Sequence, residues 1–135
     1  MNEIYFPMTA DILTCGHIKC LEFLLKKGNI YIGLLTDEAL IGYKKNVVPY
    51  KERFYVLETI AMALGGIEIV PQKSLNPTNN IKKLGCKFIA SGDGWEKEEL
   101  NTIKKLKLIP MDIKLQNEKG KKWSSSKIKE KIKSL

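Results

Sequence analysis

Short apolar runs alternate with helical patterns along the whole chain, and this alternation constrains the fold more than any other feature of the sequence. The apolar runs predict strands, and the segments between them, with apolar residues three or four apart, predict helices. The predicted strands span residues 4–6, 30–35, 67–70, 87–90 and 108–113. The predicted helices run from about residue 17 to the glycine at position 28, and over 51–64, 79–84, 96–106 and 124–135.

This order of elements predicts an α/β fold, a Rossmann-like three-layer sandwich with a five-stranded parallel sheet. Residues 30–35 are apolar throughout, which is typical of a parallel strand buried on both faces. The 135 residues fit a single domain, residues 1–135. We expect residues 37–49 to be irregular, and Ile132 and Leu135 of the last helix to point inward.

Composition restricts the partners and the compartment. The chain has 23 basic and 15 acidic residues, a net charge of +8, which favours anionic partners. A lysine excess is equally consistent with genome composition. No apolar run approaches the ~18 residues that a membrane span needs, and we expect no secretory signal. The three cysteines fit no metal or disulfide spacing, so reduced thiols and a cytoplasmic location are expected.

Parallel α/β sheets bind ligands at the carboxyl ends of their strands. The first loop expected at this edge, residues 7–17, contains the only histidine of the chain, His17, after Gly16. A histidine at a helix start can donate to a phosphate held by the helix N-terminus. The alternative is a helix-capping segment with a solvated histidine. Cys15 has no group to orient it as a nucleophile.

Three further segments fall at the same predicted edge. Ser124, Ser125 and Ser126 follow several lysines at a helix start, where they either bind phosphate or cap the helix. The turn at 91–96 either contacts a base or ribose, or is a tight turn with a half-buried tryptophan. The only arginine, Arg53, either pairs with Glu52 or Asp37 or contacts a phosphate.

The order and spacing of four motifs resemble the cytidylyltransferase family of nucleotidyltransferases. The chain is similar to small bacterial glycerol-3-phosphate cytidylyltransferases, and closer to the cytidylyltransferase-like domains fused to phosphoenolpyruvate mutase, whose likeness includes residues 33–39 and 43–45. The motifs that carry the resemblance are Thr14-Cys15-Gly16-His17, Glu52-Arg53, Gly92-Asp93-Gly94-Trp95-Glu96 and Trp123-Ser124-Ser125-Ser126-Lys127-Ile128.

The chain departs from the family pattern at three points. Thr14 stands where the first motif histidine is usual, as it does in some adenylyltransferases of the wider superfamily. Gly94 replaces the second aspartate of the turn. The arginine that usually precedes the C-terminal motif is not found, and Lys119, Lys121 or Lys122 would substitute for it without bidentate geometry.

The resemblance implies the transfer of CMP from CTP to a small phosphorylated or phosphonate acceptor, with release of pyrophosphate. It implies catalytic roles for His17, Thr14, Lys44 and Arg53. It also implies Mg²⁺ carried by the triphosphate near Asp11, and a homodimer. The nucleotide-binding residues that it implies are Met8, Thr9, Ala10, Asp11, Gly16, His17, Gly92, Asp93, Trp95, Ser124, Ser125 and Ser126.

Three other functions stay open at this point. Thr14 favours an adenylyltransferase that uses ATP. The three departures together favour a nucleotide-binding module without catalysis. The charge and the lysine tail favour an RNA-binding protein, although the chain lacks the interleaved aromatics of single-strand binders, so nucleic acid is the less favoured partner.

Overall fold

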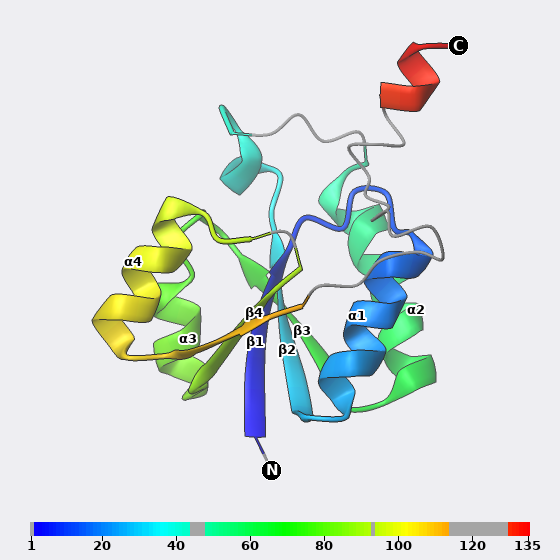
Figure 1. Cartoon of the computed structure of the whole chain (residues 1–135). Coiled ribbons are helices and arrows are strands. Elements are labelled where there is room, and N and C mark those ends of the chain that lie inside the picture. Colours follow the sequence, from blue (N-terminus) through cyan, green and yellow to red (C-terminus); the bar gives the residue numbers. More distant parts are fainter. Residues whose placement is uncertain (1, 44–47, 93, 114–129) are drawn as a thin grey trace.

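The architecture is a parallel sheet between two layers of helices. The structure is a computed structural model and describes residues 2–43, 48–92, 94–113 and 130–135. Five parallel strands lie in the order β3-β2-β1-β4-β5 (Figure 1). Their bounds are β1 Asn2–Met8, β2 Gly28–Leu35, β3 Ile67–Gln72, β4 Phe88–Ser91 and β5 Ile109–Asp112. The predicted α/β class and the five-stranded parallel sheet are confirmed.

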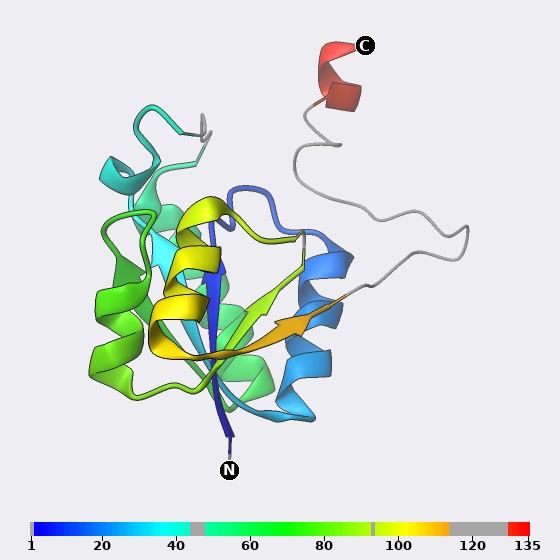
Figure 2. The same cartoon turned by 60° about the vertical axis from the view of Figure 1, so that its left-hand side comes forward.

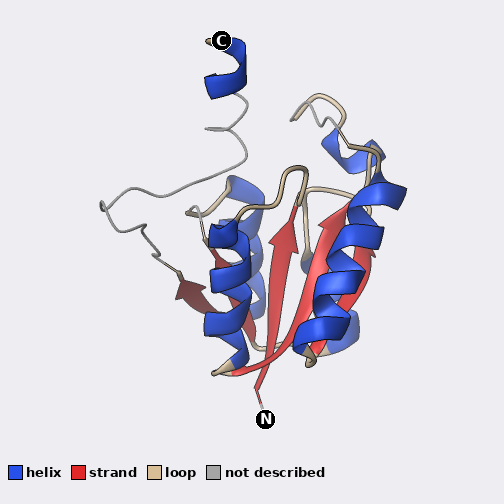
Figure 3. Cartoon of the chain, turned by 90° about the vertical axis from the view of Figure 1, so that its right-hand side faces the viewer, coloured by secondary structure: helices blue, strands red, loops and turns tan. Residues whose placement is uncertain are grey.

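Two helices cover each face of the sheet. Helices α1 (Cys15–Leu25) and α2 (Tyr50–Leu64) lie on one face, and α3 (Thr78–Leu84) and α4 (Lys97–Leu106) lie on the other (Figures 1 and 3). The part of the chain that the structure describes contains no helix with the length and apolarity needed to cross a bilayer.

The segment after β2 is more ordered than the sequence predicts. The sequence predicts that residues 37–49 are irregular, but Glu38–Leu40 form a 3₁₀ turn, η1. The Thr36 hydroxyl accepts the Ala39 N–H at 3.2 Å. Leu40 is buried, and Leu75 from the loop after β3 packs against the cluster that contains it. This tertiary contact is not visible in local sequence.

The prediction for the end of the chain is partly wrong. Residues 130–133 are helical, as expected, whereas 124–129 lie outside the described residues. Ile132 is 59% exposed and Leu135 97% exposed, although the sequence predicts that both point inward. Figure 2 shows that this end of the chain lies away from the sheet and its helices, which leaves both side chains exposed.

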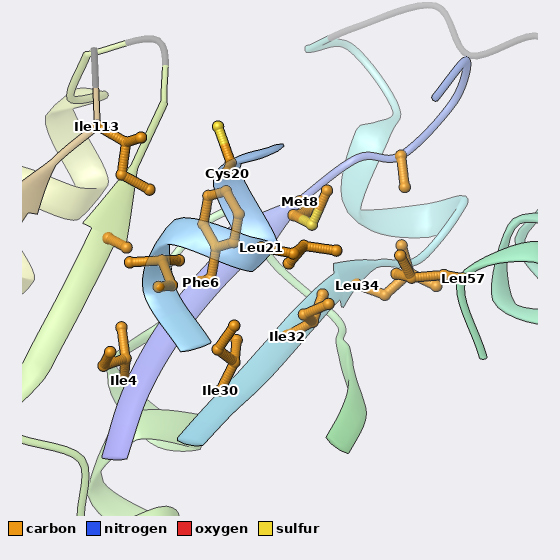
Figure 4. Close-up of a cluster of buried hydrophobic side chains, with 13 residues drawn as sticks. Ile4, Phe6, Met8, Cys20, Leu21, Ile30, Ile32, Leu34, Leu57 and Ile113 are labelled. Carbon is orange, nitrogen blue, oxygen red and sulfur yellow. The ribbon is translucent and has the colours of Figure 1, made fainter. Parts of the chain in front are cut away.

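Alternation along the strands places a main hydrophobic cluster on each face of the sheet. Ile4, Phe6 and Met8 of β1 point toward α1 and α2, together with side chains of β2 such as Ile32 (Figure 4). Tyr5 points the other way, into a second cluster with Ile81 of α3 and Ile89 of β4. Each fully buried aliphatic side chain of this kind stabilises the fold by roughly 1.5–3 kcal/mol.

The strand order reverses between β1 and β4, and this is the topological switch point of the sheet. The chain passes from β1 to β2 and β3 on one side, and then returns across β1 to β4 on the other. The loops that leave the carboxyl ends of β1 and β4 therefore run to opposite faces of the sheet. Such a reversal of strand order is where doubly wound sheets bind their ligands.

A buried hydrogen-bond network joins β1, β3 and α3 on the α3/α4 side. The Tyr5 hydroxyl donates to Gln72 Oε1 at 2.7 Å and accepts from Asn80 Nδ2 at 2.9 Å. Tyr5 is fully buried, and this burial raises the pKa of its hydroxyl well above its ordinary value. Gly33 makes room for the network, because an added Cβ would lie 2.6 Å from Gln72 Oε1 and closer still to the Tyr5 ring.

Replacing Tyr5 with phenylalanine tests how much this network contributes to the free energy of unfolding. Tyr5→Phe should lower the free energy of unfolding by about 1–3 kcal/mol, because Gln72 Oε1 stays buried without its donor. Tyr31→Phe is the matched control, since Tyr31 is the register partner of Tyr5 on β2 and its hydroxyl makes no hydrogen bond within the described residues. The control should change stability by less than about 0.5 kcal/mol. Urea denaturation measures both, and equal stability of the two variants would contradict the network.

Candidate functional site

Thr14 and His17 form a local hydrogen-bonded pair at the start of α1. Thr14 is the N-cap residue, with φ −123° and ψ 171°, and its backbone N–H donates to Nδ1 of His17 at 2.9 Å. The Thr14 hydroxyl lies 3.0 Å from the same ring nitrogen. A backbone N–H can only donate, so Nδ1 is the acceptor and the neutral ring carries its proton on Nε2. In this tautomer Nε2–H is the hydrogen-bond donor of the ring.

The loop between β1 and α1 has an unusual backbone at Ala10. Its φ is +53°, in the left-handed region that residues with a Cβ rarely adopt. Met8, two residues before it, places its side chain in the α1/α2 core, so a contact between Met8 and a nucleotide would have to come from its main chain. Asp11, just after it, is 7% exposed, and its Oδ1 accepts the N–H of Val48 at 2.8 Å.

Arg53 is buried beneath the carboxyl edge of the sheet and is 1% exposed. Its Nε donates to the carbonyl of Val48 at 2.9 Å, and Nη1 donates to the carbonyls of Thr9 at 2.6 Å and Leu35 at 2.8 Å. Nη2 pairs with the carboxylate of Asp37 at 2.9 Å. Of the two carboxylates weighed from the sequence, Asp37 is thus the partner seen in the structure. A phosphate contact of Arg53 stays a prediction.

Asp37 also caps α2 from a distance in the sequence. Its two carboxylate oxygens lie 3.1 and 3.2 Å from the N–H of Tyr50, the first residue of the helix. Pro49, at the N-cap position, has no side chain able to cap. The Arg53–Asp37 pair therefore joins the end of β2 to the start of α2, and the negative charge lies where the helix dipole favours it.

The turn after β4 is closed by its own hydrogen bond. The Ser91 hydroxyl donates to the carbonyl of Gly94, whose φ is +95°. Trp95 is half-buried and packs against the cluster that contains Tyr5, which agrees with the tight turn considered as an alternative from the sequence. Its contact with a base stays a prediction, and Asp93 lies outside the described residues.

Tyr43 links two loops at this edge and is not among the site residues that the sequence predicts. Its hydroxyl hydrogen-bonds the carboxylate of Glu96, and burial together with this carboxylate raises the pKa of Tyr43 to about 12. Burial also raises the pKa of Glu99, in the first turn of α4. The only sequence signal for Tyr43 is its position immediately before Lys44, because its partner Glu96 lies more than fifty residues away.

The structure brings two of the predicted segments to the switch point. The loop that contains Thr9, Ala10 and Asp11 leaves the end of β1 and leads to Gly16 and His17 in the first turn of α1. Gly92 and Trp95 follow the end of β4, the strand beside β1. Lys44, Asp93, Ser124, Ser125 and Ser126 lie outside the described residues, and their predicted roles stay predictions.

Within residues 2–43, 48–92, 94–113 and 130–135, no group of three or more histidine, cysteine, aspartate or glutamate side chains is placed to hold a metal. Asp11, the predicted metal residue, uses Oδ1 to accept the Val48 N–H. A magnesium ion bound through phosphates needs only one or two protein carboxylates, so the predicted role of Asp11 toward Mg²⁺ stays a prediction.

The family follows from comparison with known proteins. The family model for cytidylyltransferase-like domains matches residues 5–131. This chain belongs to the cytidylyltransferase-like family. The family resemblance predicted from the four motifs is confirmed, whereas the two named subgroups within it stay a prediction. Comparison with curated proteins finds no matching sequence.

Solved structures share the fold of this family member at low identity. A protein with unknown function from Archaeoglobus fulgidus has a TM-score of 0.70 and 18% identity, and the match covers 83% of this chain and 89% of that one. A lipopolysaccharide core biosynthesis protein from Thermoplasma volcanium has the same score and identity, over 87% and 99%. A macrolide-efflux protein from Streptococcus pneumoniae matches at TM-score 0.62 and 15% identity, over 97% of this chain and 51% of that one.

Restoring the family residue at Gly94 should cost stability. An aspartate at φ +95° is strained, although its Cβ would meet no atom within 4 Å. Gly94→Asp should lower the free energy of unfolding by about 1–2 kcal/mol, which is a fall in Tm of roughly 4–7 °C in thermal unfolding. Gly94→Ala is the control without a carboxylate and should lose the same amount, because the cost lies in the backbone. Wild-type stability of both variants would rule out the left-handed turn.

Proposed function

We propose that this protein is a nucleotidyltransferase that transfers CMP from CTP to a small phosphorylated or phosphonate acceptor and releases pyrophosphate. The observation that carries the proposal is the His17 ring, whose tautomer is set by the Thr14 N–H and which presents Nε2–H at the helix start beside the switch point. Membership of the cytidylyltransferase-like family supports the choice of reaction.

The proposed step is an in-line displacement without a covalent enzyme intermediate. An oxygen of the acceptor phosphate or phosphonate attacks the α-phosphorus of CTP. The bond from this phosphorus to the oxygen that bridges to the β-phosphate breaks, and pyrophosphate leaves with the electron pair. The protein contributes positioning and stabilisation of the charge that develops on the phosphate oxygens.

Nine of the predicted site residues would contact the nucleotide in this step. His17 donates from Nε2 to an oxygen of the α- or β-phosphate, and Thr14 is a weaker partner. Lys44 neutralises the triphosphate. The cytidine contacts are assigned to Gly92, Asp93 and Trp95, and the β- and γ-phosphate contacts to Ser124, Ser125 and Ser126. Mg²⁺ is expected to travel with the triphosphate. A homodimer and a cytoplasmic location also stay predictions.

An adenylyltransferase is the second candidate, because Thr14 stands in the position where some adenylyltransferases carry threonine. Calorimetric titration with CTP and with ATP, each with and without Mg²⁺, separates the two. We expect CTP to bind at least tenfold more tightly than ATP. Selective binding of ATP would replace the proposal with the adenylyltransferase. Binding of CTP without pyrophosphate release in a screen of glycerol 3-phosphate and hydroxyalkyl phosphonates would favour a module without catalysis.

Two substitutions at His17 separate its structural role from its catalytic one. Asparagine places an acceptor oxygen as many bonds from Cα as Nδ1 and keeps the hydrogen bond from Thr14, but it has no atom at the position of Nε2. Both His17→Asn and His17→Ala should lower the rate of pyrophosphate release by about 10²–10³-fold. Only His17→Ala should lose helix-capping stability, by about 0.5–2 kcal/mol.

The two readouts are steady-state kinetics and thermal unfolding on the same preparations. If His17→Asn released pyrophosphate at the wild-type rate, His17 would have no part in the chemical step. An equal loss of stability in both variants would mean that the Thr14 hydrogen bond to the ring does not cap α1.

A further inference from the structure

We propose that Asp11 and Arg53 are positioning residues that clamp the peptide group of Val48 from both sides, and that Asp11 is not a metal ligand. The proposal rests on the proposed function, because it concerns the same site. It assigns both residues to holding the loop that leads to His17, and not to direct contact with the nucleotide or its metal.

Both hydrogen-bonding groups of Val48 are held by buried charged side chains. Its N–H donates to Asp11 Oδ1 at 2.8 Å, and its carbonyl accepts from Arg53 Nε at 2.9 Å. Asp11 is 7% exposed and Arg53 is 1% exposed. Hydrogen bonds to charged groups in such surroundings are short and strong. Val48 therefore anchors the segment before α2 to the loop after β1.

The other donors of Arg53 extend the clamp to two strand ends. Nη1 holds the carbonyl of Thr9, at the end of β1, and the carbonyl of Leu35, the last residue of β2. Thr9 and Asp11 flank Ala10, whose left-handed backbone needs surrounding contacts to persist. The clamp thus holds both sides of the strained residue in the loop that carries Thr14 and His17.

The donor geometry distinguishes a clamp from a simple positive charge. The planar guanidinium of Arg53 donates four hydrogen bonds, to acceptors on Val48, Thr9, Leu35 and Asp37. A lysine has the same charge but a single nitrogen at the end of a flexible stem, so it cannot reach these acceptors together. Arg53→Lys is therefore the variant that keeps the charge and removes the clamp.

The chemistry of Asp11 offers a matching distinction. Asp11→Asn keeps a carbonyl oxygen that can accept the Val48 N–H, but it loses the negative charge that a hard cation prefers. Asp11→Ala loses both. A metal ligand and a clamp therefore respond differently to the asparagine variant.

The first readout needs no nucleotide. Amide hydrogen exchange of Val48, followed by NMR of the ¹⁵N-labelled protein, reports the Asp11 hydrogen bond directly. We expect exchange in Asp11→Asn within about threefold of the wild type, and exchange at least tenfold faster in Asp11→Ala. Unchanged protection in Asp11→Ala, or full loss in Asp11→Asn, would overturn the clamp. If Asp11→Ala does not fold, protection of Val48 in the asparagine variant decides the question alone.

The second readout is calorimetric binding of CTP across a Mg²⁺ titration. Asp11→Asn should leave the Mg²⁺ concentration for half-maximal effect within about threefold of the wild type, and a rise of tenfold or more would make Asp11 a metal ligand. Arg53→Lys should weaken CTP binding at least tenfold, and wild-type affinity would show that only its charge matters. If the wild type binds neither CTP nor ATP, the proposed function fails. The hydrogen exchange of Val48 still shows whether Asp11 holds the Val48 N–H.

Discussion

The carboxyl edge of the sheet depends on one buried cation. Arg53 is 1% exposed, and a guanidinium in that position is tolerated only when its donors are satisfied. The acceptors are main-chain carbonyls from the end of β1, the end of β2 and the segment before α2, together with the carboxylate of Asp37. The hydrogen bonds of this one side chain therefore hold three separate parts of the chain together. The loop that bears His17 begins at this edge of the sheet.

The opposite face of the sheet is stabilised by neutral hydrogen bonds. The fully buried Tyr5 hydroxyl connects Gln72 and Asn80, and Gly33 leaves the space for it. Both networks need a polar atom to be buried with its partners, because an unpaired buried donor or acceptor is costly. The two networks share β1 but act by different chemistry: a charge joins the end of β1 to the end of β2, and a hydroxyl joins β1 to β3 and α3.

Local and distant contacts contribute differently to the candidate site. The Thr14–His17 hydrogen bond joins residues three apart at the start of one helix, so its geometry is set within the motif itself. The Tyr43–Glu96 contact and the Asp37 cap on α2 join residues far apart in the chain. A backbone at φ +95° explains why Gly94 fits this turn, where the family motif carries an aspartate.

Alternation and apolar periodicity are local properties of the chain, so the five strands, the four helices around them and the edge at which His17 lies could be predicted before the structure was known. The family could also be predicted, because the order and spacing of its motifs are visible without a structure. The structure was needed to show that Arg53 pairs with Asp37 while also holding Val48, that Asp11 accepts from Val48, and that η1 is a helical turn. These outcomes depend on which main-chain groups meet in space, and backbone carbonyls and N–H groups carry no sequence signal of their own.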